Sequence, residues 1–392
     1  MLTACDVIIL GAGAAGMFCA IEAGRRGRQV VLIDHAKAPG EKIRISGGGR
    51  CNFTNLDIRP ECFLSQNPRF ARSALSRYTQ HDFIARVDAA GISWHEKTLG
   101  QLFCDGSARE IIAMLRADME AAGVDLRLAT SVNDIRHGDG FTVETSDGTF
   151  SAPCLVVATG GKSIPKMGAT GLGYQIAERF GLGIIETRPA LVPLTFTSEQ
   201  LEQIRPLSGL SLPARVSCGK VGFEEGLLFT HRGLSGPSIL QISSYWREGY
   251  AISVDLAPDV DLGTALSEMK QARGRQAAHR VLAAYLPEKL ARHIALHAGA
   301  RGNLADLTKA RLAELVAHVH SWELRPVGTE GYRTAEVTLG GVDTRALDAR
   351  SMEARNLPGL HFIGEVVDVT GWLGGYNFQW AWSSGWVAGQ AV

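Results

Sequence analysis

A glycine-rich hexapeptide between two apolar runs is the feature that most restricts what this chain can fold into. Val7–Leu10 is short, apolar and rich in β-branched residues, which is typical of a strand buried on both faces. Gly11–Gly16 follows directly, then small and apolar residues at helical spacing, and a second apolar run over 29–33 that ends at Asp34. This order of strand, glycine turn, helix, strand and acid predicts a βαβ unit that binds a dinucleotide.

The glycines and the helix start have separate roles in such a unit. Gly11 permits the tight turn, Gly13 lets a pyrophosphate approach the backbone, and Gly16 lets helix and strand pack closely. The N-terminus of the helix that follows offers free N–H groups and a positive potential to phosphates. Asp34 then lies where its carboxylate can hold a ribose hydroxyl. A glycine-rich turn without a ligand is the alternative interpretation.

A second glycine-rich segment spans residues 42–55 and contains three consecutive glycines followed by Arg50, Cys51 and Asn52. Its lack of apolar periodicity predicts a loop whose backbone can lie against a ligand. Lys42, Arg44 and Arg50 could offset the charge of a pyrophosphate. The alternative is a flexible surface loop with solvated cations.

The rest of the chain alternates helical and strand patterns. Residues 69–122 have helical spacing around a turn, whereas 125–150 have a period of two that predicts a β-meander. Residues 154–161 predict a further buried strand that ends in small residues, Thr159 and Gly160 among them. Changes of pattern place boundaries at residues 190, 257 and 321, with short alternating runs over 191–256 and an Ala- and Leu-rich helical stretch after them.

Composition excludes several classes of protein. Lys plus Arg equals Asp plus Glu, 40 against 40, so the chain is no globally basic nucleic-acid coat. No apolar run approaches the ~18 residues of a membrane span. Seven cysteines are scattered without a Cys-x-x-Cys pair, which favours a reducing cytoplasm and predicts neither a metal site nor disulfides.

One stretch departs from this balance. Residues 261–320 hold nine Lys or Arg against five acidic residues. A solvated helical face with a chance charge bias is one interpretation, and contact with the phosphate backbone of a nucleic acid is the other.

The motifs together resemble those of FAD-binding flavoproteins with the glutathione-reductase-like fold. The resemblance rests on Gly11–Gly16, on Ala158–Gly161, and on Ile363-Gly364-Glu365 followed by Gly374-Gly375. Within that group, Ser46–Asn55 and the loop Phe229–Pro237 are similar to the BaiN/RdsA-type, YhiN-like oxidoreductases, and the similarity covers essentially the whole chain.

This resemblance implies an α/β fold: a Rossmann-like FAD-binding domain with a β-meander, interrupted by a small β-barrel domain that carries an α-helical insert. The implied FAD-binding domain has its first part at 1–190 and its second at 336–392. The implied barrel spans 191–256 and returns through 321–335, with the insert at 257–320.

The resemblance also implies which residues contact FAD. The residues expected near its ADP part are Gly11, Gly13, Ala14, Ala15, Gly16 and Asp34. Those expected along the cofactor are Arg44, Gly48, Gly49 and Arg50, and those expected beneath it are Thr159 and Gly160. Those expected at the ribityl chain and isoalloxazine are Gly364, Glu365, Gly375, Tyr376 and Asn377.

The implied activity is hydride transfer. NAD(P)H would reduce bound FAD transiently, and the reduced flavin would pass hydride to a C=C or C=N bond while an acid protonates the other atom. Cys51 and His231 are the candidate acids. The substrates implied range from steroid-like acids to a uridine of ribosomal RNA, and the sequence does not choose between a small molecule and RNA.

Other functions remain open at this stage. No second Gly-x-Gly-x-x-Gly follows a strand, so the substrate itself could donate electrons, as in an O₂-using flavin oxidase of a small amine or alcohol such as aminoacetone. A further alternative is an RNA-binding factor with structural FAD, and a plain NAD dehydrogenase shares the first motif. A disulfide reductase is disfavoured because Cys51 has no nearby partner cysteine.

Overall fold

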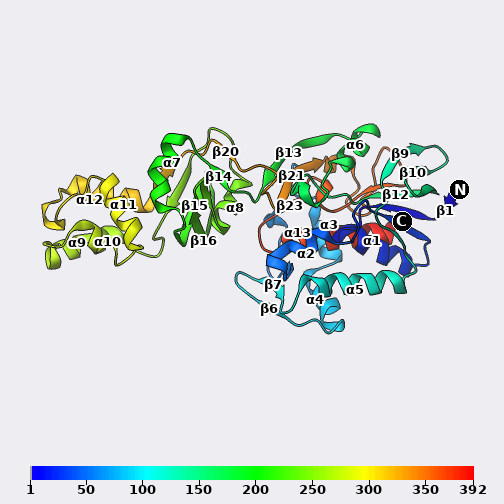
Figure 1. Cartoon of the computed structure of the whole chain (residues 1–392), viewed down its shortest axis with the longest axis horizontal. Helices are drawn as coiled ribbons and strands as arrows, with labels where there is room; N and C mark the ends of the chain where they lie inside the picture. The colour runs from blue at the N-terminus through cyan, green and yellow to red at the C-terminus, as the bar shows by residue number, and fades with distance from the viewer. Residues whose placement is uncertain (1) are drawn as a thin grey trace. The chain divides into compact units, whose positions relative to one another are not determined.

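A computed structural model describes residues 2–392, which divide into two compact units. One unit contains the chain up to Pro189 together with Glu336–Val392, and the other contains Ala190–Ala335. The chain therefore leaves the first unit once and returns to complete it (Figure 1).

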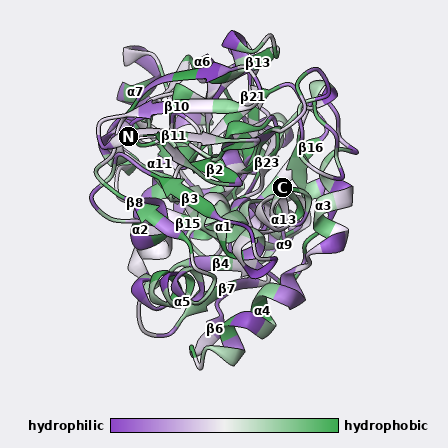
Figure 2. Ribbon diagram, turned by 90° about the vertical axis from the view of Figure 1, so that its right-hand side faces the viewer, coloured by the Kyte–Doolittle hydropathy of each residue, from purple (hydrophilic) through white to green (hydrophobic). Residues whose placement is uncertain are grey.

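A five-stranded parallel sheet forms the centre of the first unit. Its order is β22-β12-β2-β3-β8, which corresponds to Leu360–Phe362, Cys154–Val157, Val7–Leu10, Val30–Ile33 and Asp125–Arg127. Every residue of β2 and β3 is buried, and Figure 2 shows both strands as hydrophobic. Short apolar runs covered on both faces are what a parallel sheet of this kind requires.

The predicted β-meander is correct for three of its strands and wrong for the first. β9 (Val132–His137), β10 (Phe141–Thr145) and β11 (Gly148–Ala152) pair antiparallel, and β1 (Leu2–Ala4) joins β11 in parallel. β8 instead pairs with β3 in the central sheet. Its alternating pattern indicates a strand, but a parallel partner almost a hundred residues away leaves no local signal.

Two helices cover one another closely in this unit. α13 (Tyr376–Ala391) packs on α1 (Ala14–Arg25) through glycines one helical turn apart. A Cβ on Gly385 would lie 2.6 Å from the Ala15 carbonyl oxygen, and one on Gly389 would lie 2.7 Å from Glu22 Cβ. The absence of these side chains is what allows the two helices to approach so closely.

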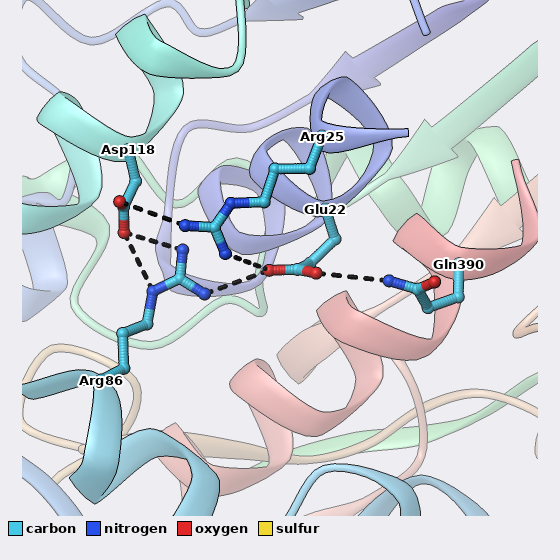
Figure 3. A network of polar contacts seen from close by, with 5 residues as sticks. All are labelled: Glu22, Arg25, Arg86, Asp118 and Gln390. Carbon is cyan, nitrogen blue, oxygen red and sulfur yellow. Dashed lines mark hydrogen bonds and ion pairs between the residues drawn. The ribbon is translucent and has the colours of Figure 1, made fainter. Parts of the chain in front are cut away.

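A polar network ties the same helices to α4 (Gln80–Ala89) and α5 (Ala108–Ala121). Arg86 donates to Asp118 at 2.7 and 2.9 Å and to Glu22 at 3.1 Å, and Gln390 donates to the other Glu22 oxygen at 3.3 Å (Figure 3). Arg25 contacts the same two acids from the solvent side. Side chains from four helices are thereby joined.

The helical prediction over 69–122 overlooked a hairpin. α3 (Ala71–Arg77), α4 and α5 are helical, but β6 (Trp94–Glu96) and β7 (Gln101–Cys104) lie between α4 and α5. They form a three-stranded sheet with β4 (Asn52–Asn55). β6 and β7 are so short that the surrounding helical periodicity obscures them. The remaining elements here are α2 (Glu41–Gly49), α6 (Leu172–Arg179) and the strand pairs β5–β23 (Phe63–Leu64, Thr370–Gly371) and β13–β21 (Ile184–Ala190, Val337–Val342).

The second unit contains a seven-stranded antiparallel sheet and a group of helices. The strand order is β19-β18-β15-β16-β17-β14-β20, corresponding to Trp322–Leu324, Ile252–Asp255, Ser211–Cys218, Val221–Phe229, Gly233–Ser235, Leu194–Thr195 and Gly328–Thr329. The helices are α7 (Ser198–Ile204), α8 (Pro237–Ser243), α9 (Leu262–Arg273), α10 (Ala278–Leu282), α11 (Glu288–His297) and α12 (Lys309–His320). His320 Nδ1 lies 2.8 Å from an Asp255 carboxylate oxygen, which joins α12 to β18.

None of the helices within 2–392 is both long and apolar enough to cross a membrane.

Candidate nucleotide-binding site

The glycines of the first turn have two different surroundings. Gly11 has φ +105°, and a Cβ there would lie 2.5 Å from the Ala158 carbonyl oxygen. A Cβ on Gly16 would lie 1.9 Å from the Gly11 carbonyl oxygen, whereas one on Gly13 would meet no atom within 4 Å. Gly11 and Gly16 therefore allow backbone packing, and Gly13 borders the open space that a pyrophosphate needs.

The first turn of α1 is electrostatically prepared for an anion. Gly13 is the N-cap, no side chain caps the helix, and its first turn has no acidic residue. The N–H groups at the start of the helix, at Ala14 and Ala15, thus have no side-chain acceptor and lie at the positive end of the helix dipole. This arrangement suits the phosphates of a dinucleotide.

Asp34 folds back onto the glycine turn at the end of β3. One carboxylate oxygen accepts the Ala12 N–H at 2.6 Å, and the other accepts the Ala36 N–H at 2.8 Å. These bonds fix the carboxylate, which keeps further lone pairs for a ribose hydroxyl.

The second glycine-rich segment is a short helix rather than a simple loop. α2 begins at Glu41 and becomes non-helical at Ser46–Gly48, where Gly47 and Gly48 have φ values of +57° and +67°. A Cβ on Gly48 would meet nothing within 4 Å, and one on Gly49 would only reach the Arg44 carbonyl oxygen at 4.0 Å. The backbone is thus open at Gly48 and Gly49, whereas the residues before Ser46 form a helix in place of the predicted loop.

The two arginines of this segment are both exposed. Arg44 forms an ion pair with Glu41 on the same helix. Arg50 is the C-cap of α2 and has no ion pair within residues 2–392.

The end of β12 provides another open backbone. Gly160 has φ +71° and no atom within 4 Å of a Cβ position, and Thr159 lies beside it. Thr159 Oγ1 is buried without a hydrogen-bond partner in the described part of the chain. A buried hydroxyl in that state is expected to bond to a ligand or an ordered water.

Glu365 is the most constrained predicted site residue. Lys42 Nζ lies 2.6 Å from one of its carboxylate oxygens, while Ser163 Oγ and the Thr338 N–H donate to the other at 2.8 and 2.9 Å. Burial alone would raise the pKa of Glu365. The charge of Lys42, together with hydrogen bonds from Lys42, Ser163 and the Thr338 N–H, instead holds this pKa below its usual range. No sequence motif contains Ser163 or Thr338, and only folding brings them here.

Gly364 and Gly375 lie in turns that contact the rest of the unit closely. Gly364 N–H donates to Ser384 Oγ, and its carbonyl accepts from Trp380 Nε1, both at 3.0 Å. Gly375 has φ +96°, and a Cβ there would lie 2.3 Å from the Thr54 carbonyl oxygen. These contacts place the turns at Gly364 and Gly375 against the rest of the unit.

Tyr376 and Asn377 make contacts within the protein. Asn377 Oδ1 accepts the Gly371 N–H at 2.8 Å, and its Nδ2 donates to the Gly371 carbonyl at 2.9 Å. Tyr376 is buried and packs edge-on against Phe63 and Trp372. Both side chains therefore hold the 371–375 turn in shape.

The two candidate acids have opposite environments. Cys51 belongs to the first unit, is fully buried, and has a thiol whose pKa is raised by burial. His231 belongs to the second unit and is exposed just after β16. Residues 2–392 contain no group of three or more His, Cys, Asp or Glu side chains that could hold a metal ion.

An open glycine turn at the carboxyl end of a parallel sheet, an uncapped helix start and an acid after the next strand define a Rossmann-type dinucleotide-binding protein. Residues 5–391 match the HI0933-like protein Rossmann domain. The chain belongs to this family, the FAD-dependent oxidoreductases that its motifs resemble, and the predicted Rossmann-like α/β fold is confirmed.

The chain is similar over its length to proteins with assigned names. It is 52% identical to the ribosomal RNA dihydrouridine synthase of Escherichia coli (strain K12), across 98% of this chain and 97% of that one. It is 28% identical to the 3-dehydro-bile acid delta(4,6)-reductase of Clostridium scindens, across 98% of both. A quinol-fumarate reductase structure has the same fold, with a TM-score of 0.51 at 15% identity, covering 100% of this chain and 71% of that one.

Proposed function

We propose that this FAD-dependent oxidoreductase uses NAD(P)H to reduce a C=C bond, and that its substrate is a uridine of ribosomal RNA. The observation that carries the proposal is the full-length similarity, at 52% identity, to a protein named for making dihydrouridine in ribosomal RNA. The more distant delta(4,6)-reductase is named for a different substrate but also for a reduction. C=C reduction is the chemistry these two names share.

The cofactor site supports this proposal through the chain's own residues. The Gly13 backbone and the start of α1 would hold the pyrophosphate of FAD, and Asp34 would hold the adenosine ribose. Gly48, Gly160 and the unpartnered Thr159 hydroxyl would border the cofactor further along. Bound FAD supplies hydride transfer, so that overall NAD(P)H, one proton and uridine give NAD(P)⁺ and dihydrouridine.

The ion pair between Lys42 and Glu365 suits the part of the site where the ribityl chain and isoalloxazine of FAD would lie. The ion pair keeps the Glu365 carboxylate charged in a largely covered position, and Ser163 and Thr338 fix its orientation. A charged, oriented carboxylate can accept hydrogen bonds from the ribityl hydroxyls, in agreement with the role expected for Glu365. Cys51 and His231 are the candidate proton donors named from the sequence, and complete burial makes Cys51 the weaker of the two.

The helical stretch 261–320 supports contact with RNA. Six of its cations are exposed and form no ion pair within the described residues, namely Arg273, Arg275, Arg280, Lys289, Arg301 and Lys309. Within residues 2–392, two further arginines of the stretch do form ion pairs, Arg292 with Glu288 and Arg311 with Glu314. Exposed, unpaired cations can neutralise phosphates of a nucleic acid.

The first test is an anaerobic absorption spectrum of the purified protein before and after addition of NADPH. Flavin bands that bleach support a resident FAD and an NAD(P)H-linked reductase. Bands that persist with NADPH and bleach with aminoacetone would favour the O₂-using oxidase instead.

The second test concerns the substrate. Ribosomal RNA transcribed in vitro, and hence unmodified, is incubated with the protein, FAD and NADPH and digested to nucleosides for mass spectrometry. We expect a nucleoside heavier than uridine by two hydrogens, and none when NADPH is omitted. Bleaching by NADPH without this product would retain the reductase and reject the RNA substrate.

A further inference from the structure

A cavity outside the nucleotide site is lined by arginines. It has a volume of about 330 Å³ and lies in the first unit, between the residues before α3 and the segment 344–355. Arg69, Arg345 and Arg355 line it together with the amide of Asn67, and no carboxylate is among its lining residues. Three guanidinium groups around a space of this size are a setting for an anion.

The acids nearby neutralise this charge only in part. The Arg345 guanidinium makes a bidentate ion pair with Asp343, with N···O distances of 2.5 to 3.0 Å. A guanidinium nitrogen of Arg355 lies 3.9 Å from an Asp348 carboxylate oxygen. Arg69 has no ion pair anywhere in residues 2–392. The side chains of Arg345 and Arg355 are 72% and 59% exposed, so both can turn further donors toward a ligand.

Thr344 gives an independent indication that the cavity takes a ligand. It also lines the cavity, its residue is 1% exposed, and its Oγ1 is buried without a hydrogen-bond partner in the described part of the chain. Leaving a buried hydroxyl unpaired costs free energy, and a hydrogen-bond acceptor bound beside Thr344 would remove that cost.

The cavity is also close to the predicted flavin end of the nucleotide site. Phe70 lines the cavity and packs against Trp380, with ring centroids 6.3 Å apart. Trp380 Nε1 donates to the Gly364 carbonyl. Two aromatic side chains in contact, Phe70 and Trp380, thus connect the cavity to a turn expected to reach the isoalloxazine.

We propose that Arg69, Arg345, Arg355 and the Thr344 hydroxyl bind a phosphate group of the RNA backbone, on the nucleotides that flank the reduced uridine. This inference rests on the proposed function. Guanidinium groups recognise phosphate through paired N–H donors, and such contacts hold a nucleic acid in register without reading its bases. The cavity thereby helps to set which uridine reaches the flavin.

The test compares two triple variants with equal loss of charge. Arg69→Gln, Arg345→Gln and Arg355→Gln are combined in one protein. The matched control combines Arg109→Gln, Arg116→Gln and Arg136→Gln, all exposed on α5 and β9 of the same unit. Binding of a fluorescein-labelled, uridine-containing single-stranded RNA is measured by fluorescence anisotropy at several salt concentrations.

We expect the cavity variant to bind RNA at least about tenfold more weakly than the wild type. The slope of log affinity against log salt should also become shallower by about 0.7 for each phosphate that the variant no longer neutralises. The control should retain most of the wild-type affinity. Equal affinity in the cavity variant and the control would overturn the proposal.

A single substitution separates binding from folding. Thr344→Val keeps the shape of the side chain and removes the unpartnered hydroxyl, so its thermal stability should equal or exceed that of the wild type. Its RNA affinity should fall several-fold. Unchanged affinity would show that the Thr344 hydroxyl does not contact the RNA. The proposal would then lose the independent indication that the cavity binds a ligand.

A final comparison distinguishes the source of the phosphate. The half-saturating NADPH concentration for flavin bleaching should be the same in the cavity variant and the wild type. If it rises while RNA affinity is unchanged, the cavity binds a phosphate of the reductant and the proposal is overturned. If the wild type makes dihydrouridine but the cavity variant binds RNA normally, only this proposal fails. If the wild type neither binds nor reduces RNA, the proposed function fails as well.

Discussion

At the scale of single residues, Gly11 and Gly13 stand two positions apart, yet a side chain would meet protein at one and open space at the other. Gly11→Ala places a methyl group 2.5 Å from the Ala158 carbonyl at a positive φ, so we expect a loss of about 1–3 kcal/mol in the free energy of unfolding. Gly13→Ala should leave stability within about 0.5 kcal/mol and weaken FAD binding about tenfold or more.

Thermal denaturation of the apoprotein and titration with FAD measure these two effects separately. Gly27→Ala is the control for backbone strain alone, because Gly27 has φ +81° and nothing within 4 Å of a Cβ position. An unaltered FAD affinity in Gly13→Ala would show that the pyrophosphate does not approach this residue.

The burial of Cys51 gives a clear expectation for its role. Because the side chain is fully covered and burial raises the pKa of its thiol, Cys51→Ala should lower the free energy of unfolding by about 1 kcal/mol and leave kcat unchanged. The steady-state rate at which each protein reduces uridine-containing RNA with NADPH tests this. A large fall in kcat with normal FAD content would instead make Cys51 the proton donor, and His231→Gln provides the parallel measurement for the other candidate.

His361 should make stability depend on pH. Burial on β22 lowers the pKa of its imidazole below 6.5, although the bond to the Ser351 carbonyl and the nearby Glu353 charge act the other way. The folded protein therefore binds a proton less readily than the unfolded chain, so stability is full above 6.5 and falls as the pH drops below it.

Urea unfolding between pH ~5 and ~8 checks this expectation, with a slope of at most about 1.4 kcal/mol per pH unit from this group. The slope should shrink in His361→Gln, whereas exposed His231→Gln should keep it. The same slope in wild type and His361→Gln would assign the effect to other groups.

At the scale of elements, the Arg25 and Arg86 side chains share two acids but differ in burial. Arg86 is 12% exposed and Arg25 is 49% exposed. Arg86→Met would leave the nearly buried Glu22 without its main partner, so we expect a loss of about 3 kcal/mol in the free energy of unfolding. Arg25→Met should cost less than about 1 kcal/mol because its pairs are exposed to solvent. Urea unfolding followed by tryptophan fluorescence compares the two, and equal losses would contradict this explanation.

Local sequence pattern predicted elements better than it predicted their partners. The runs Val7–Leu10 and Cys154–Val157 are strands covered on both faces of the sheet. Their short, almost wholly apolar composition is typical of such strands, so the local sequence was enough to predict them. The destination of β8 depends on β3, and the β6–β7 hairpin depends on β4. Such pairings between distant segments are decided by tertiary packing, which a window of neighbouring residues does not contain.

At the scale of the whole molecule, the helices of the second unit offer a test of RNA contact that is independent of the first unit. Replacing Arg273, Arg275, Arg280, Lys289, Arg301 and Lys309 with Gln removes exposed, unpaired charge and leaves Lys270, which donates to the Leu307 carbonyl, in place. We expect weaker RNA binding with a shallower salt dependence and unchanged bleaching by NADPH. RNA affinity equal to that of the wild type would show that these cations contact solvent and not the RNA.

The candidate site was predictable where one short segment supplies it and not where several meet. Gly11–Gly16 and Asp34 follow from a single βαβ pattern. Glu365 was named from the resemblance, but its partners Ser163 and Thr338 come from segments far from Lys42 in the sequence, and no motif marks them. The cavity at Arg345 was equally invisible, because its arginines become neighbours only when 336–392 rejoins the first unit.

The packing of α13 on α1 has a consequence for how the protein is made. α1 leaves the ribosome long before α13, the helix that covers it, has been translated. Meanwhile the second unit, Ala190–Ala335, emerges as an uninterrupted stretch that can fold first. The nascent chain therefore carries an uncovered apolar helix until α13 has been made. A chain that stops before Tyr376 lacks α13, so it cannot close its first unit and is open to proteolysis.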